Sequence, residues 1–158
     1  MAKYYQSGFY SKKNLGMELE DELVNVTSLY FSKKGDKGFQ PAVGTKADKE
    51  QGTDAYIWGV PCDFTCNFAG KDHMTVLQKD VPIGHGISVK FGVRTGNSYK
   101  GYKKFNTPVL VIGIDGADTS VLNRWLENIT SLFASKIGDI IDVGQTQYWD
   151  WCDENGVE

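Results

Sequence analysis

The chain has 158 residues, of which 41% are hydrophobic and 13% aromatic, so it is not intrinsically disordered and is expected to form one domain over residues 1–158. No apolar run approaches the ~20 residues that a membrane span needs, and no secretory signal is visible, so we expect a cytoplasmic protein without membrane contact. The net charge of −3 is uneven, because residues 1–104 hold 15 Lys and Arg against 11 Asp and Glu, whereas residues 105–158 hold 2 against 9.

The first predicted element is a helix over residues 14–34, in which apolar residues recur at helical spacing. Glu22 lies between Leu19 and Val26 on the apolar stripe, so its carboxylate either borders the core or points into a site on a neighbouring sheet. A glycine-rich loop over residues 35–52 is expected to follow the helix.

The central part of the chain predicts β-structure. The stretch "DAYIWGVPCDFTCN" is typical of a hairpin with its turn near Gly59, "ISVKFGVR" alternates apolar and polar residues, and "PVLVIGI" fits a buried strand. A second helix is predicted over residues 117–143, and residues 145–158 form an acidic, aromatic tail. The expected fold is therefore α/β, a single domain with a mixed central sheet of about four strands flanked by two main helices.

Two carboxylates on the predicted hairpin indicate a site. If the turn falls near Gly59, Asp54 and Asp63 lie almost opposite one another, and cross-strand neighbours have Cβ atoms ~4.5–5.5 Å apart. Two like charges at that separation repel, so solvent, an arginine or lysine, or a hard divalent cation must offset them. Thr65 shares the strand face of Asp63, two residues further on.

A helix acid followed by two hairpin acids resembles the PD-(D/E)XK nuclease superfamily, and the resemblance covers about residues 14–137. The expected order helix–strand–strand–strand–helix–strand is similar to the core of that superfamily. The resemblance implies a restriction-endonuclease-like fold and a nuclease-like domain that hydrolyses phosphodiester bonds in DNA. In such enzymes paired acids hold Mg²⁺ or Mn²⁺, and a lysine positions or activates the attacking water.

Applied to this chain, the resemblance implies a metal shell formed by Asp54, Asp63, Glu22 and Glu50. The catalytic lysine of the family falls on Thr65, which cannot supply a positive charge. Because some members of the superfamily carry the lysine on a neighbouring element, we expect Lys90 to act with the two aspartates, and Lys71 is the second choice.

Basic residues predict where a nucleic acid would contact the chain. The basic N-terminal part of the chain, and lysines interleaved with aromatic residues in "YKGYKKF", are compatible with phosphate contact and base stacking. The expected phosphate-binding residues are Arg94, Lys100, Lys103 and Lys104. The alternative is that these residues form a solvated strand face and loop.

Thr65 also favours a different class of protein, a catalytically degenerate nuclease fold that works by binding. Such a protein, encoded by a phage or another mobile element, would act in the host-cell cytoplasm and inhibit a host defence complex, as anti-CRISPR proteins do. Aromatic residues of the tail, Tyr148, Trp149 and Trp151, would then be interface anchors. A third possibility is a structural accessory protein that forms a homodimer.

Overall fold

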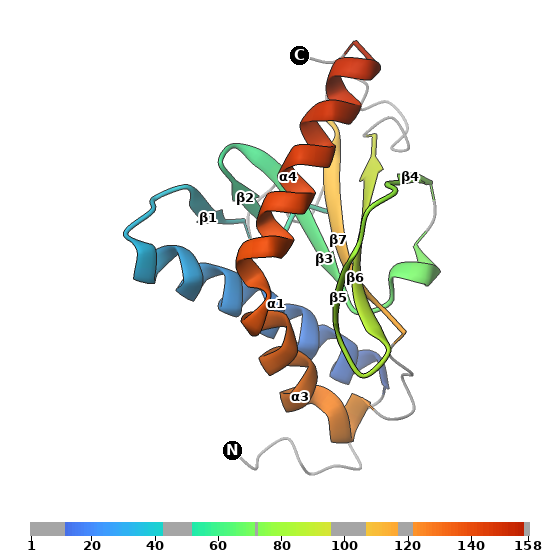
Figure 1. Ribbon diagram of the computed structural model, residues 1–158. Helices are drawn as coiled ribbons and strands as arrows, with labels where there is room; N and C mark the ends of the chain where they lie inside the picture. Colours follow the sequence, from blue (N-terminus) through green and yellow to red (C-terminus); the bar gives the residue numbers. More distant parts are fainter. Residues whose placement is uncertain (1–11, 43–51, 72, 96–106, 117–121, 157–158) are drawn as a thin grey trace.

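The chain folds into a mixed β-sheet with helices packed against it (Figure 1). The computed structural model describes residues 12–42, 52–71, 73–95, 107–116 and 122–156. In chain order the elements are α1 (Lys12–Lys34), β1 (Phe39–Pro41), β2 (Ala55–Ile57), β3 (Val60–Thr65), the 3₁₀ turn η3 (Phe68–Gly70), β4 (Met74–Val76), β5 (Val81–Gly84), β6 (Ile87–Arg94), β7 (Val109–Asp115), α3 (Leu122–Ser135) and α4 (Ile137–Glu154). The prediction of an α/β fold with a mixed sheet is confirmed. The expected numbers are wrong, because the described residues form seven strands rather than about four and three α-helices rather than two.

The strands lie in the order β1-β2-β3-β7-β6-β4, and β5 also pairs with β6. Among the described strands, β3 and β7 form the parallel pair and the other pairs are antiparallel. The chain passes from β3 to β7 through η3, β4, β5 and β6, and both α3 and α4 follow β7. The order that was compared with the nuclease superfamily, with a helix between the third and fourth strands, is therefore not observed, whereas the predicted elements taken in chain order, a helix, then strands, then a helix, agree with the structure.

The two longest strands form the centre of the sheet because their sequences suit burial. β6 alternates buried and half-buried residues over most of its length, as its sequence pattern predicts. β7 is buried from Val109 to Ile114, as expected for a strand covered on both faces. The sequence did not predict β1, β4 and β5, which have three or four residues each and carry proline or polar residues. Their own sequences favour a strand only weakly, so they are strands because they pair with neighbouring strands.

The three helices cover one face of the sheet and share a single apolar core with it (Figure 1). Leu19 and Leu23 of α1 and Phe133 of α3 are fully buried in this core. Gly144 of α4 lies against β6, where an added Cβ would come 2.9 Å from the Cε1 atom of Phe91. The opposite face of the sheet carries the polar side chains of β3 and β6.

The C-terminal region differs from its prediction. The helix expected over residues 117–143 is two helices within its described part, because the chain turns at Lys136 between α3 and α4. Residues 145–154 of the acidic, aromatic tail form the second half of α4, whose apolar stripe continues through Tyr148 to Cys152. The Tyr148 hydroxyl donates a hydrogen bond of 2.7 Å to the backbone oxygen of Pro108, so this residue belongs to the core.

Within the part of the chain that the structure describes, none of the helices combines the length and the apolar character that crossing a membrane requires.

Candidate functional site

Two of the four carboxylates nominated by the sequence, Asp54 and Asp63, meet on the face of the sheet opposite the three α-helices. The β2–β3 hairpin turns at Trp58 and Gly59, which both have positive φ (49° and 83°), as a two-residue type I′ turn requires. The turn pairs Ala55 with Cys62, and just beyond this last pair the backbone N–H of Asp54 donates a hydrogen bond of 2.8 Å to the backbone oxygen of Cys62. Asp54 therefore lies beside the strand that carries Asp63, and the two carboxyl groups interact.

Asp54 is a half-buried carboxyl group that accepts a hydrogen bond of 2.8 Å from the backbone N–H of Phe64. Burial raises the pKa of Asp54 to about 7, the Phe64 N–H opposes this rise, and the charge and hydrogen bonding of Asp63 add to it. Near neutral pH the Asp54 carboxyl group is therefore protonated for part of the time.

Asp63 is the more deeply placed acid, and two cations contact the same oxygen of its side chain. Arg94 Nη1 lies 2.9 Å and Lys71 Nζ lies 3.3 Å from Asp63 Oδ2. The Arg94 side chain is 13% exposed, and its Nη2 also donates to the backbone oxygen of Gly52 at 3.2 Å. Arg94 is therefore an ion-pair partner of Asp63 inside the site rather than an open phosphate-binding group on the sheet surface.

Thr65 begins the turn that delivers Lys71 to this site. Its buried hydroxyl accepts a hydrogen bond of 3.1 Å from the backbone N–H of Asn67, and η3 follows directly. Lys71 is the C-cap of η3, so the chain reverses within six residues and returns a lysine to Asp63. The residue that replaces the expected lysine thus takes part in positioning another one.

A third carboxylate approaches from α1, and it is Glu20 rather than the predicted Glu22. The Oε2 atom of Glu20 accepts a hydrogen bond of 3.3 Å from the backbone N–H of Cys66, just beyond the end of β3. Burial raises the pKa of Glu20, although the Cys66 N–H and the charge of Lys71 oppose the rise. Glu22 is half-buried on α1, and no contact with the two aspartates is observed for it within the described residues.

Lys90 does not join the acids. Its Nζ atom lies 3.0 Å from Asp80 Oδ2, in an ion pair that is about one-third exposed (34% and 38%). Lys90 shares a sheet face with Arg94, but its partner lies in the segment that precedes β5. The other nominated residues, Glu50, Lys100, Lys103 and Lys104, lie outside the described residues.

The donor chemistry of the acid pair suits Mg²⁺, although its geometry is not that of a complete metal cage. No three His, Cys, Asp or Glu side chains within the described ranges converge closely enough to hold a metal. However, Mg²⁺ is commonly bound by one or two carboxylates together with waters and substrate phosphates, and two adjacent aspartates meet that requirement. A buried hydroxyl, Thr53 Oγ1, precedes Asp54 and has no hydrogen-bond partner among the described residues.

Comparisons with models of protein families, with curated proteins and with solved structures found no match to this chain.

Two residues of the site, Glu20 and Lys71, were misjudged from the sequence. In the described part of α1 the buried residues recur every four positions, at Leu19, Leu23, Thr27 and Phe31, and Glu20 and Glu22 flank this row on opposite sides. The row alone does not choose between the two acids; the hydrogen bond from the Cys66 N–H identifies Glu20 as the one that faces the end of β3. The position of Lys71 depends on the η3 turn, for which the only sequence signal is the short "TCNFAGK" segment.

Proposed function

We propose that this chain is a nuclease-like domain that hydrolyses phosphodiester bonds in DNA with the help of Mg²⁺ or Mn²⁺. The observation that carries the proposal is the convergence of two adjacent carboxylates, Asp54 and Asp63, with the amine of Lys71, 3.3 Å from Asp63. Paired acids beside a lysine are the groups that metal-assisted hydrolysis of a phosphodiester needs. Buried ionisable groups with shifted pKa values, as found at Asp54 and Glu20, are also typical of functional sites.

Each group in the site has a separate role in this proposal. Asp54 and Asp63 bind the cation together with a phosphate of the substrate, and the bound cation supplies charge neutralisation and an activated water. Lys71, with its side chain 36% exposed, takes the part first assigned to Lys90 and orients the water or neutralises the phosphate. Arg94 fixes the carboxylate of Asp63 through its ion pair and its bond to Gly52.

The choice between the two lysines gives a direct test. Incubation of plasmid and linear DNA with the protein and Mn²⁺ should yield cleavage that Lys71→Met lowers by about 10²-fold or more, since a positioned acid–base or charge partner typically contributes that much. Lys90→Met is the matched control, because it also removes one lysine from an ion pair, and it should retain activity within about 3-fold. Equal losses in both variants would contradict the role given to Lys71.

A second candidate function, a catalytically inactive protein that acts by binding, is favoured by the charges around Asp63. Arg94 and Lys71 already offset this carboxylate, and Thr65 supplies no charge. In that case the chain would bind DNA or a protein complex of a host without any metal, as a phage or mobile-element inhibitor would. Absence of cleavage by the wild type, together with DNA binding that is unchanged by Mn²⁺ and by Asp54→Asn, would favour this candidate.

A further inference from the structure

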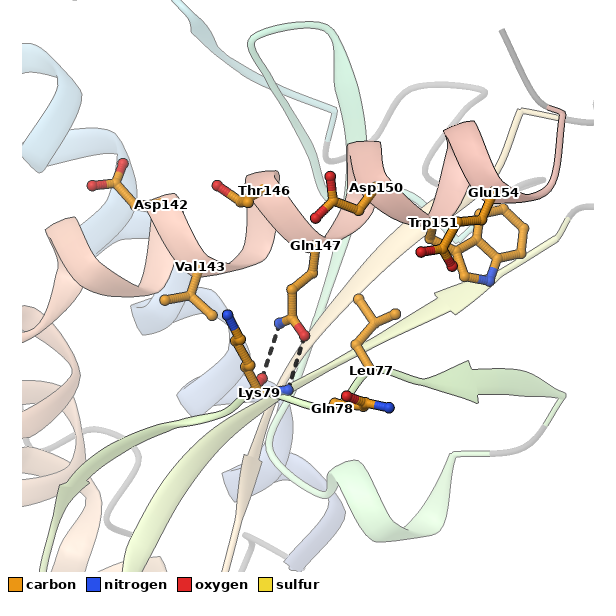
Figure 2. Close-up of a pocket in the computed structure, with 10 residues that line it drawn as sticks. All are labelled: Leu77, Gln78, Lys79, Asp142, Val143, Thr146, Gln147, Asp150, Trp151 and Glu154. Atoms are coloured by element: carbon orange, nitrogen blue, oxygen red, sulfur yellow. Dashed lines mark hydrogen bonds between the residues drawn. The ribbon is translucent and has the colours of Figure 1, made fainter.

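A hollow of about 540 Å³ lies between α4 and the segment that follows β4 (Figure 2), and neither Asp54 nor Asp63 lines it. One wall is α4 from Asp142 to Glu154, and the other is the segment of residues 77–79 that follows the edge strand β4. Figure 2 shows that Gln147 joins the two walls: its side-chain amide donates to the backbone oxygen of Lys79 at 2.9 Å and accepts from the Lys79 N–H at 2.8 Å. The shape of the hollow is thus fixed by a two-point contact between its walls.

The lining of the hollow divides into an apolar floor and an acidic rim. Apolar side chains that are half-buried form the floor: Leu77, Val143 and Trp151. Exposed carboxylates form a row on α4 at four-residue multiples: Asp142, Asp150 and Glu154. The α-helical rise places successive acids of this row about 12 Å and about 6 Å apart along the axis. Lys79 is the one cation in the lining, so the hollow carries an excess of negative charge.

The acidic row is unfavourable for the helix that carries it. The C-terminal end of a helix has a negative partial charge, so cations stabilise it and carboxylates destabilise it. α4 has no basic residue in its last turn, and Asp150, Asp153 and Glu154 all lie near that end. No ion pair with these three acids is observed among the described residues. Local rules are commonly broken where a residue serves function rather than stability.

Trp149 is an exposed aromatic residue of α4 that does not line the hollow. Its side chain is 47% exposed, and it packs edge-on against Tyr148 with ring centroids 5.2 Å apart. Of the three aromatic residues nominated as anchors, Trp149 is therefore exposed, Trp151 lines the hollow and Tyr148 is buried in the core.

We propose that this hollow is the docking site for a basic, amphipathic segment of a protein partner, whose apolar side chains enter between α4 and residues 77–79 while its Lys or Arg side chains pair with the acidic row. Charge complementarity decides the class of partner, since the rim is acidic and a nucleic acid would be repelled. The mode is an amphipathic segment in a groove, with one apolar and one charged edge. The proposal is independent of the nuclease-like function, because it uses the opposite face of the sheet.

The test uses the full-length protein and a labelled twelve-residue amphipathic peptide of Leu and Lys, with a second peptide that carries Glu in place of every Lys. Fluorescence anisotropy should detect binding of the basic peptide and no binding of the acidic peptide. The triple variant Asp142→Asn, Asp150→Asn and Glu154→Gln should weaken binding by about tenfold or more, given the typical strength of three partly exposed ion pairs. The matched control, Asp139→Asn with Asp153→Asn, neutralises acids of the same helix that do not line the hollow and should change Kd by less than about 2-fold.

A second variant, Leu77→Ser with Val143→Ser, keeps every acid and removes part of the apolar floor; thermal unfolding confirms that it is folded. It should also weaken binding by about tenfold, because two apolar side chains lose their burial against the peptide. Unchanged binding in this variant would reduce the site to a non-specific acidic surface and overturn the proposal. Sedimentation of the protein alone provides the other decisive outcome, since a dimer that the triple variant dissociates would assign this face to a second copy of the chain.

Discussion

At the scale of single residues, the acid pair is a balance between burial, repulsion and ion pairing. Asp63 and Arg94 are 10% and 13% exposed at their side chains, and removal of one member of such a buried pair typically costs ~3–5 kcal/mol. Within the described residues Asp54 forms no ion pair, it accepts one hydrogen bond from the backbone N–H of Phe64, and burial raises its pKa to about 7. Asp54 is therefore the residue at which the carboxylate charge can be removed without leaving a buried cation unpaired.

This difference predicts how stability depends on pH. In the folded chain Asp54 retains its proton up to about pH 7, whereas in the unfolded chain it loses the proton near its ordinary value of ~3.9. Between these values the folded state binds more protons, so the free energy of unfolding falls as pH rises, by at most about 1.4 kcal/mol per pH unit. The contribution of protonated Asp54 to the free energy of unfolding is fully present below about pH 4 and is lost above about pH 7.

Urea unfolding of the wild type and of Asp54→Asn at pH 5, 6, 7 and 8 measures this effect. The variant should lack the decline that Asp54 causes, so that its stability relative to the wild type increases with pH. Asp80→Asn, which removes an exposed acid paired with Lys90, should follow the wild type. If the stability of Asp54→Asn and of the wild type changed with pH in parallel, the raised pKa of Asp54 would be contradicted.

At the scale of elements, close contact between α4 and β6 holds the C-terminal helix on the sheet. Gly144 faces Phe91, which is fully buried, and the lack of a side chain at this position lets the helix backbone approach the strand. The same helix contributes Gln145, whose side-chain nitrogen donates to the backbone oxygen of Ile57 at 3.2 Å. The contact between α4 and the sheet therefore depends on Gly144, which has no side chain, and on the buried amide of Gln145, which donates a hydrogen bond to the last backbone oxygen of β2.

Substitution of two glycines of α4 tests the contact. Gly144→Ala should destabilise the protein by about 1–3 kcal/mol, because the new methyl group meets Phe91 in a packed core, and this exceeds the gain of up to ~1 kcal/mol in helix propensity. Gly138→Ala is the control, since its Cβ would lie 3.1 Å from the hydroxyl of the half-buried Tyr30, which has room to move. Thermal or urea unfolding should show Gly138→Ala at or above wild-type stability. Equal effects of the two substitutions would contradict this account of the contact.

At the scale of the whole molecule, the C-terminal region is part of the core rather than an appendage. Tyr148 and Cys152 are 2% and 1% exposed, and Tyr148 bonds to the segment that enters β7. Truncation of a tail would leave the domain intact, whereas truncation of α4 exposes the sheet face beneath it.

A chain that ends at Gly144 should therefore lose cooperative unfolding, while a chain that ends at Gly156 should unfold like the wild type. Circular dichroism during heating distinguishes the two results. A cooperative transition in the shorter chain, within about 1 kcal/mol of the wild type, would contradict the placement of Tyr148 and Cys152 in the core.

The sequence predicts those parts of the molecule whose signal is local. The alternation in β6 and the apolar run of β7 are sufficient to identify buried strands, and the hairpin turn at Gly59 is sufficient to bring Asp54 near Asp63. Three-residue strands such as β4 carry little sequence signal, because pairing with a neighbour defines them. The third carboxylate and the lysine of the site depend on helix phase and on a 3₁₀ turn, which are set by packing in three dimensions.

The measurement that most directly tests the central proposal is calorimetric titration of Mn²⁺ and Mg²⁺ into the wild type, Asp54→Asn and Asp80→Asn at pH 8, above the pKa of Asp54. The nuclease-like account predicts that wild type and Asp80→Asn bind the cation and that Asp54→Asn does not, while all three remain folded. Absence of binding by the wild type, or equal binding by Asp54→Asn, would contradict it. The ion pairs of Asp63 with Arg94 and Lys71 would then be the final state of the site, and the chain would be better described as a protein that acts by binding.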